Sequence, residues 1–183
     1  LLIYGLFSAT DLLAEEADSN IKDAKYNLPV LLTSAGQAAD VLIMKGLCRK
    51  AGLELTLQKS AAPDSIARFK TIILVAGGSS KGLGAAKIDV DDEEKRIEKM
   101  LKAAHKAKIP VIVFHIGGEA RRGALSDPFN ELAARGGQLI VVAADGDKDG
   151  MFKKIAKKNK AQYLHIDKSF ESIGVLKELF GLE

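Results

Sequence analysis

The sequence is short of aromatic residues and of cysteine. Aromatic side chains make up 5% of its 183 residues, and tryptophan is absent. Cys48 is the single cysteine, which excludes a disulfide within the chain and a cysteine-based zinc site. Because its neighbours are apolar, we expect Cys48 to be a small core residue rather than a nucleophile. The scarcity of aromatic residues near the loops also argues against a bound flavin, which would need a stacking side chain.

An excess of charge of one sign is also lacking. The chain has 27 lysines and arginines against 24 acids, a net charge of +3. A nucleic-acid-binding protein would show a concentrated basic face with stacking aromatics, so we expect no nucleic-acid partner. The lysine-rich stretch 153–160 is interpreted as the solvated face of one helix. Length and a hydrophobic content of 47% predict one well-cored domain rather than two.

The first 14 residues are apolar and differ from those that follow. They are too short to span a bilayer, and we interpret them as the remnant of a signal peptide, followed by a polar linker (15–27) and the domain itself (28–183). This predicts an extracytoplasmic protein, periplasmic or secreted, with no stable membrane span after processing. The alternative is an amphipathic terminal helix.

Strand and helix signals alternate from Pro29 to the C-terminus. Buried strands are expected at 29–33, 71–75, 110–114 and 138–143, with weaker strands at 53–57 and 163–166. Helices are expected at about 37–50, 62–69, 90–107, 127–135, from 150 onward, and 170–180. This pattern predicts a three-layer α/β/α sandwich with a mostly parallel sheet of five or six strands, flavodoxin-like or Rossmann-like. The first choice of strand order is 2-1-3-4-5 with a sixth strand at the edge, and 3-2-1-4-5-6 is the second.

Four loops that follow strands hold much of the glycine: 34–37, 77–84, 115–123 and 145–150. In a parallel sheet all four meet at the carboxyl edge of the strands. Glycine lets the backbone approach a ligand closely, so the clustering predicts a pocket at this edge.

The residues of these loops suit a small anionic ligand. Amides at helix starts, hydroxyls and a guanidinium group together favour a phosphate, carboxylate or sulfonate. The predicted ligand-binding residues are Ser34, Gln37, Gly77, Gly78, Ser79, Ser80, Lys81, Gly117, Gly118, Arg121 and Arg122. The alternative is that the two arginines pair with Glu119, Asp127 or the acids near residue 90 and join loops to one another.

Nucleotide-cofactor motifs do not fit. Glycines at 78, 82 and 84 match the pattern that resembles short-chain dehydrogenases, but they follow the third strand rather than the first. Tyr163 also lacks a lysine four positions later, and no P-loop is present. The sequence therefore predicts no particular cofactor.

Asp145, Asp147 and Asp149 precede Gly150 with the spacing of the first half of a calcium loop. Ala156 stands where an EF-hand needs its bidentate glutamate, which excludes that motif. A partial calcium site and a turn with Asp149 as N-cap are the two interpretations that stay open.

Two further hypotheses concern other classes of function. His115 with Ser34, or with a carboxylate, could serve as the base and nucleophile of a hydrolase at the same edge. The helix expected at 37–50 is apolar on more than one face, which favours a homodimeric interaction module.

Four stretches together resemble a known family: V-L-L-T-S-A-G-Q, I-L-V-A-G-G-S-S-K-G-L-G-A-A, F-H-I-G-G-E-A-R-R-G and D-G-D-K-D-G. The resemblance runs from about Leu28 to the C-terminus and is to exported bacterial proteins classed only as a domain of unknown function. It implies an extracytoplasmic domain of Rossmann-like or flavodoxin-like shape. It implies no activity and no catalytic residues.

Overall fold

Six parallel strands form one sheet in the order β2-β1-β3-β4-β5-β6. The computed structural model describes residues 26–183. The strands are β1 (Val30–Ala35), β2 (Thr56–Leu57), β3 (Thr71–Ala76), β4 (Val111–His115), β5 (Leu139–Ala143) and β6 (Gln162–Ile166). The helices are α1 (Asp40–Lys50), α2 (Ser80–Ala86), α3 (Val90–Lys106), α4 (Asp127–Gly136), α5 (Met151–Asn159) and α6 (Ser172–Phe180), with short 3₁₀ turns η2 (Pro63–Ile66), η3 (Gly118–Arg121) and η4 (Ser169–Glu171).

This strand order confirms the first choice and makes the fold flavodoxin-like. β1 pairs with both β2 and β3, so the chain reverses its direction of progress across the sheet between β1 and β3. In such sheets the crevice at the reversal, outside the carboxyl ends of the strands, is where ligands bind. The topology therefore singles out the ends of β1 and β3.

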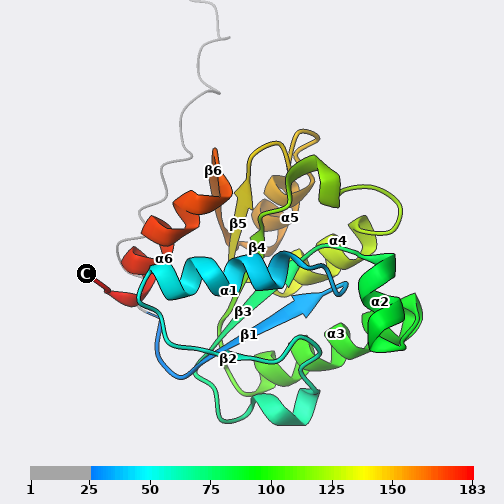
Figure 1. The fold of residues 1–183 in the computed structure, drawn as a ribbon, viewed down its shortest axis with the longest axis horizontal. Coiled ribbons are helices and arrows are strands. Elements are labelled where there is room, and N and C mark those ends of the chain that lie inside the picture. Colours follow the sequence, from blue (N-terminus) through cyan, green and yellow to red (C-terminus); the bar gives the residue numbers. More distant parts are fainter. Residues whose placement is uncertain (1–25) are drawn as a thin grey trace, which may run out of the picture.

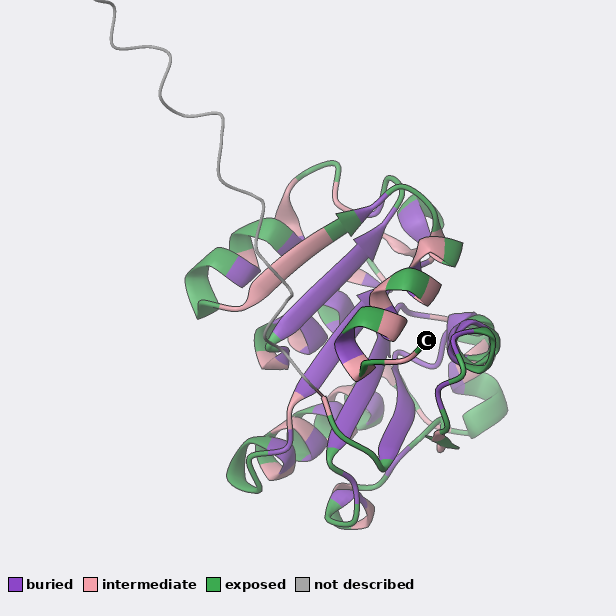
Figure 2. Cartoon of the chain, turned by 90° about the vertical axis from the view of Figure 1, so that its left-hand side faces the viewer, coloured by how far each residue is buried: buried purple, intermediate pink, exposed green. Residues whose placement is uncertain are grey.

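Two apolar cores cover the two faces of the sheet. Figure 1 shows α1 lying across one face of the strands, and α6 packs beside α1 on that same side. The opposite face packs against α3, α4 and α5. Alternate residues of each strand enter the two cores, as the pleat requires: in β1, Leu31 joins one cluster and Leu32 the other. Figure 2 shows the central strands buried, the edge strand β6 partly exposed, and the helices exposed on their outer sides.

Several boundaries differ from the expected ones. β1 extends to Ala35 and includes Ser34, which was expected in the loop, and the helix expected at 62–69 is only the 3₁₀ turn η2. β2 is limited to Thr56–Leu57, because the chain before it makes no ladder with β1. α1 begins at Asp40 rather than at Gln37, whose φ of 60° is outside the helical region. The stretch expected as a glycine-rich loop contains a helix, α2, which Ser79 caps by accepting a hydrogen bond from the amide of Gly82.

The predicted signal-peptide remnant (1–14) and most of the linker (15–27) lie outside the described residues. Within 26–183, none of the helices has both the length and the apolar character that crossing a bilayer requires. Cys48 is fully buried, as expected of a core residue.

Candidate functional site

The loops after β1 and β3 are joined to each other at the carboxyl edge. Gln37 and Gly78 form an isolated antiparallel bridge, and the amide of Ser79 donates to the carbonyl of Gly36. A Cβ on Gly82 would overlap the carbonyl oxygen of Gln37, so α2 sits directly on the loop after β1. The glycine at 82 is therefore required for packing between these two loops.

The glycines that were predicted to admit a ligand are also in contact with protein atoms. A Cβ on Gly117 would overlap the side chain of Arg121, and a Cβ on Gly77 would lie 3.3 Å from Cδ of the same arginine. A Cβ on Gly118 would lie 2.6 Å from Oδ1 of Asp145. The glycine-rich edge is thus largely a set of loops packed on one another. Many of its glycines allow contact between loops rather than the approach of a ligand.

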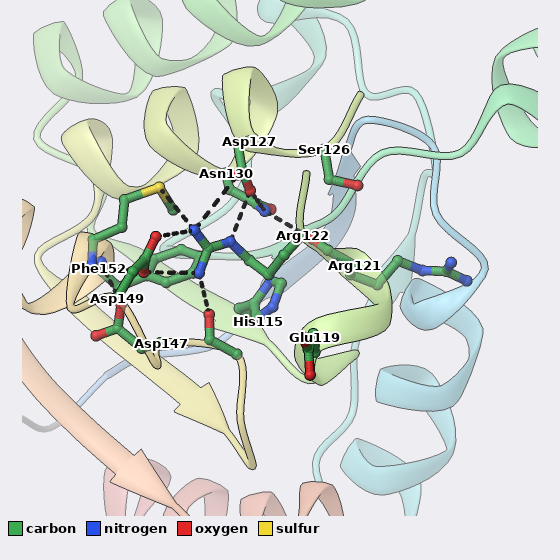
Figure 3. Close-up of polar contacts among 12 residues, drawn as sticks. His115, Glu119, Arg121, Arg122, Ser126, Asp127, Asn130, Asp147, Asp149 and Phe152 are labelled. Atoms are coloured by element: carbon green, nitrogen blue, oxygen red, sulfur yellow. Dashed lines mark hydrogen bonds and ion pairs between the residues drawn. The ribbon is translucent and has the colours of Figure 1, made fainter. Parts of the chain in front are cut away.

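Arg122 is the centre of an ion-pair network (Figure 3). Its Nε donates to Asp127 at 2.7 Å, and its Nη2 donates to Asp149 at 2.7 Å. Nη1 donates to the other oxygen of Asp149 and to the carbonyl of Gly146. These bonds use the donors of the guanidinium group, so Arg122 is not free to bind a ligand anion. The alternative reading of the paired arginines is confirmed for this residue.

The network shifts the acid–base equilibria of its members. Hydrogen bonds from Arg122 lower the pKa of Asp149 to about 2. Burial raises the pKa of Asp127, but the bonds from Arg122, Gly123 and Asn130 outweigh it, and the net pKa lies below the ordinary value. Both carboxylates are therefore ionised across the physiological range and hold the loop after β4 to α4 and to the loop after β5.

The three aspartates of the half calcium loop point to different partners. Asp145 accepts from the amide of Glu119, and Asp147 accepts from the amides of Phe152 and Lys153 at the start of α5. Asp149 is held by Arg122. No cluster of three or more potential metal ligands exists among residues 26–183. This arrangement gives the calcium hypothesis no support. The amides at the start of α5 bond mainly to Asp147, and Asp149 also accepts from the amide of Met151 at 3.2 Å.

Sequence reasoning missed a buried ion pair beneath the loop after β1. Glu93 is 0% exposed and accepts hydrogen bonds from the amide of Gly36 and from Nε2 of Gln37. Arg96 pairs with Glu93 at 2.7 Å and donates to the backbone carbonyls of Ser34 and of the loop after β2. Glu93 was one acid among several at a helix start, and nothing in its spacing distinguished it from its exposed neighbours.

The proposed pair of Ser34 and His115 is contradicted by the sheet. Ser34 lies on the same face of β1 as Val30 and Leu32, which pack against α1. It is fully buried there, and its hydroxyl has no hydrogen-bond partner among the described residues. His115 lies two strands away, on β4, and packs on the opposite face with its ring centroid 4.9 Å from that of Phe152. The sheet separates the two side chains.

His115 is also enclosed. Its ring is fully buried, its Nε2 lies 3.1 Å from the carbonyl oxygen of Gly118, and a Cβ on Gly146 would touch the ring. Burial lowers the pKa of His115. The carbonyls of Gly118 and Ala76 and the charge of Asp40 act to raise it, but the net pKa is below the ordinary value. A neutral, covered imidazole of this kind is a packing residue in the present conformation.

The remaining predicted ligand-binding residues divide into two groups. Ser79 is occupied as the cap of α2, and Gln37 is occupied by Glu93. Ser80 and Lys81, in the first turn of α2, are exposed. Only the second group presents side chains to the outside.

Arg121 differs from its neighbour Arg122. It extends away from the network of Figure 3 and crosses Gly77, at the end of β3, to reach Asp40 in the first turn of α1. Its Nε donates to Asp40, and its two Nη atoms have no hydrogen-bond partner among residues 26–183. The side chain of Arg121 is 31% exposed and that of Asp40 is 8% exposed. A guanidinium group with free terminal nitrogens thus lies at the β1–β3 reversal.

Comparisons with solved structures give weak matches. AlinE4, an esterase of the SGNH-hydrolase family, is 9% identical over 73% of this chain and 72% of that chain, with a TM-score of 0.31. A GDSL-like lipase from Bacteroides thetaiotaomicron is 12% identical over 74% of this chain and 66% of that chain, with a TM-score of 0.33. At these values the likeness transfers no site and no activity.

No curated protein matches the sequence significantly. A family model described as a domain of unknown function, DUF6305, matches residues 27–180, which is nearly all of the domain. The glycine-rich loops, the Arg122 network and all six strands fall within the matched range. The chain belongs to the DUF6305 family.

Proposed function

We propose that this domain binds a small anion at the carboxyl edge of the sheet, over the β1–β3 reversal, and that it acts as a binding domain rather than as a hydrolase. The observation that carries the proposal is Arg121, whose terminal nitrogens have no partner among residues 26–183 although its side chain is held in place by Asp40. A planar guanidinium group with two free nitrogens can bind a carboxylate or phosphate in a bidentate manner.

Three elements position this group. The ion pair with Asp40 fixes Arg121 against the first turn of α1, and Gly77 supplies the flat surface over which its side chain passes. The first turn of α2 adds Ser80 and Lys81, since α2 is packed against the loop after β1. Ser80 and Lys81 thus follow β3 at the same edge of the sheet as Arg121, which is the edge where this topology binds ligands.

A hydrolytic function has less support. Ser34 and His115 face opposite sides of the sheet, and both are fully buried. A nucleophile and its base need hydrogen-bond distance and access to a substrate. The described residues offer neither for this pair, so binding is the better conclusion.

The test uses inorganic phosphate, sulfate and citrate as probes, titrated by calorimetry at low ionic strength. Arg121→Gln should weaken the best-bound probe at least tenfold, because one charge-assisted bidentate contact contributes about 1.5–3 kcal/mol. Asp40→Asn should strengthen binding several-fold, since it removes the carboxylate that competes for Arg121. Arg49→Gln, on an exposed arginine in the last turn of α1, is the matched control and should leave affinity unchanged.

Opposite effects of the two substitutions separate a ligand role from a purely structural one. If Arg121 only joined loops, both variants would lower stability and neither would change the affinity of the probes. Equal affinities in wild type, Arg121→Gln and Asp40→Asn would refute the proposal.

We further infer that the protein acts outside the cytoplasmic membrane. The support is the apolar run at residues 1–14 followed by a polar stretch, the pattern of a processed signal peptide. N-terminal sequencing of the protein from a cell envelope fraction tests this, and a chain that still starts at or before Leu1 in the cytosol would contradict it.

A homodimer through α1 is the second candidate function. Leu42 and Ile43 are 46% and 53% exposed on this helix, beside a face that is already packed on the sheet. Two adjacent exposed aliphatic side chains favour a contact with a second copy. Sedimentation across a wide concentration range tests it, and a monomer throughout would remove it.

A further inference from the structure

A hollow lies at the amino-terminal edge of the sheet, away from the carboxyl edge. It has a volume of about 660 Å³ and is bounded by the last turns of α3 and α4, the starts of β4 and β5, and the turn from α5 into β6. Small-molecule sites fall in the same range of volumes, about 300–1,000 Å³. None of the predicted ligand-binding residues lines it.

The inner part of this cavity is apolar. Ile109 and Val111, at the start of β4, are 7% and 2% exposed, and Leu101 and Leu132 face it from α3 and α4. Ala161 closes the side formed by the turn into β6. These side chains belong to, or pack against, the larger of the two cores. The floor of the cavity is therefore part of a well-packed apolar core.

Its walls are held by specific contacts. Gly136, at the end of α4, packs so closely that a Cβ would lie 2.6 Å from Cδ2 of Leu101. Nδ2 of Asn159 donates to the carbonyl of Arg135 at 3.1 Å, which ties the end of α5 to the end of α4. The cavity is therefore built from elements that are fixed to one another, which preorganises it for a ligand.

The mouth of the cavity is basic. Lys102, His105, Arg135 and Lys160 line it together with a single acid, Glu98. Cations favour the ends of helices, and three helices end here, which accounts for part of this charge. Lys106 in the last turn of α3, and Lys157 and Lys158 in the last turn of α5, already interact favourably with the dipoles of those helices. The Lys102–Glu98 contact is long, at 3.8 Å between exposed groups, so Lys102 and Lys160 are available to a ligand.

We propose that this cavity binds an amphiphilic anion, with an alkyl chain on the apolar floor and a carboxylate or similar head group at the lysines of the mouth. An apolar cavity alone would accept any hydrophobic molecule. The excess of positive charge at its opening selects the sign of the head group by charge complementarity. This site is separate from the one proposed around Arg121 and does not depend on it.

The probe is decanoate, titrated by calorimetry below its micelle concentration, with decanol and decyltrimethylammonium as molecules of matched chain length. Decanoate should bind with saturable one-to-one stoichiometry and at least tenfold more tightly than decyltrimethylammonium, with decanol between them. Shortening the chain from ten to eight carbons should weaken binding up to about fifteenfold, as expected for two buried methylene groups at about 0.8 kcal/mol each. Amide resonances of Gly136, Gly137 and Ala161 should shift on titration.

Variants separate the two parts of the proposal. Lys102→Gln with Lys160→Gln should weaken decanoate at least fivefold and leave decanol unchanged. The matched control, Lys45→Gln with Lys70→Gln, alters two exposed lysines that do not line the cavity and should have no effect. Ala161→Phe should fill the cavity and remove binding of both molecules, and the lysine variants keep the test informative if this variant does not fold.

Arg121→Gln should leave decanoate binding unchanged, which distinguishes this site from the carboxyl edge. No saturable binding, equal affinity for the three head groups, or resonance shifts confined to other surfaces would overturn the proposal. So would a dimer in sedimentation that Ala161→Phe dissociates, because the cavity would then be a contact between copies of the chain.

Discussion

Arg122→Met tests whether the ion-pair network holds the carboxyl edge together. The substitution keeps a long apolar side chain over Phe152 but removes the donors to Asp127, Asp149 and the carbonyl of Gly146. Breaking a fully buried pair costs about 3–5 kcal/mol, whereas an exposed pair contributes about 0–1 kcal/mol. The side chain of Arg122 is 13% exposed and that of Asp149 is 60% exposed, so we expect an intermediate loss of about 2 kcal/mol in the free energy of unfolding.

The loss should depend on pH in a defined direction. Arg122 lowers the pKa of Asp149 to about 2, below its ordinary value, so the stabilisation is fully present above the unfolded-state pKa. It disappears as pH falls through the folded-state pKa. The difference between wild type and Arg122→Met should therefore be constant from about pH 5 to pH 7 and shrink between about pH 4 and pH 2.

Urea unfolding followed by circular dichroism at pH 7, 5, 4 and 3 measures this difference. At pH 7 the thermal midpoint should also fall by roughly 4–8 °C for a chain of this size. Arg135→Met is the control, because its pair with Glu131 is exposed and one helical turn apart, and it should cost less than about 0.5 kcal/mol. A loss at pH 7 below about 0.5 kcal/mol for Arg122→Met, or one that does not change with pH, would refute the reasoning.

Two further predictions concern α2 and the core. Gly82→Ala should destabilise the protein by about 2 kcal/mol or more, because its Cβ would overlap the backbone of Gln37. Gly84→Ala meets no atom within 4 Å and should stabilise α2 by about 0.5–1 kcal/mol. Equal effects of the two substitutions in thermal melts would contradict this account of α2. Burial raises the pKa of the Cys48 thiol to about 12, so Cys48 should react with a thiol reagent at pH 8 only at the rate of unfolding, and rapid reaction of the native protein would show that the helix opens locally.

The sheet could be predicted from sequence because its signals are local and repeated. β1, β3, β4 and β5 are short runs of β-branched and aliphatic residues, each bounded by polar or glycine-containing segments, and all four are fully buried. Alternation with helices then limits the connections to right-handed crossovers and leaves few strand orders. The start of α3 is set by a similarly local contact, since Asp89 accepts a hydrogen bond from the amide of Asp92.

α2 escaped prediction because two glycines in seven residues lower helix propensity. Its stability comes from the cap at Ser79 and from packing of Gly82 on the loop after β1, which is a contact between segments 45 residues apart. Glu93 escaped for a similar reason, since its partner Gly36 is 57 residues away. Local patterns identify which residues begin a helix, but the partners of their side chains depend on tertiary contacts.

The pairing of Ser34 with His115 failed at a different step. Both residues were correctly placed at the carboxyl ends of strands, yet a strand also assigns each side chain to one face. Ser34 is in phase with Leu32, which packs against α1, and His115 is in phase with Val113, which joins the other core. The sequence shows which residues of one strand share a face. It does not show which face of the sheet each set meets, because that depends on how the strands and helices assemble.

The two neighbouring arginines give the strongest reason to look for a ligand at the carboxyl edge. An arginine that serves only to join loops can direct its donors to protein oxygens, as Arg122 does. Arg121 makes a single bond, through Nε to Asp40, and leaves its Nη atoms without partners among the described residues. The same short segment thus contains one saturated and one incompletely bonded guanidinium group, and only the second lies over the β1–β3 reversal. A structural role explains the first completely; the second still lacks the acceptor that an anion would supply.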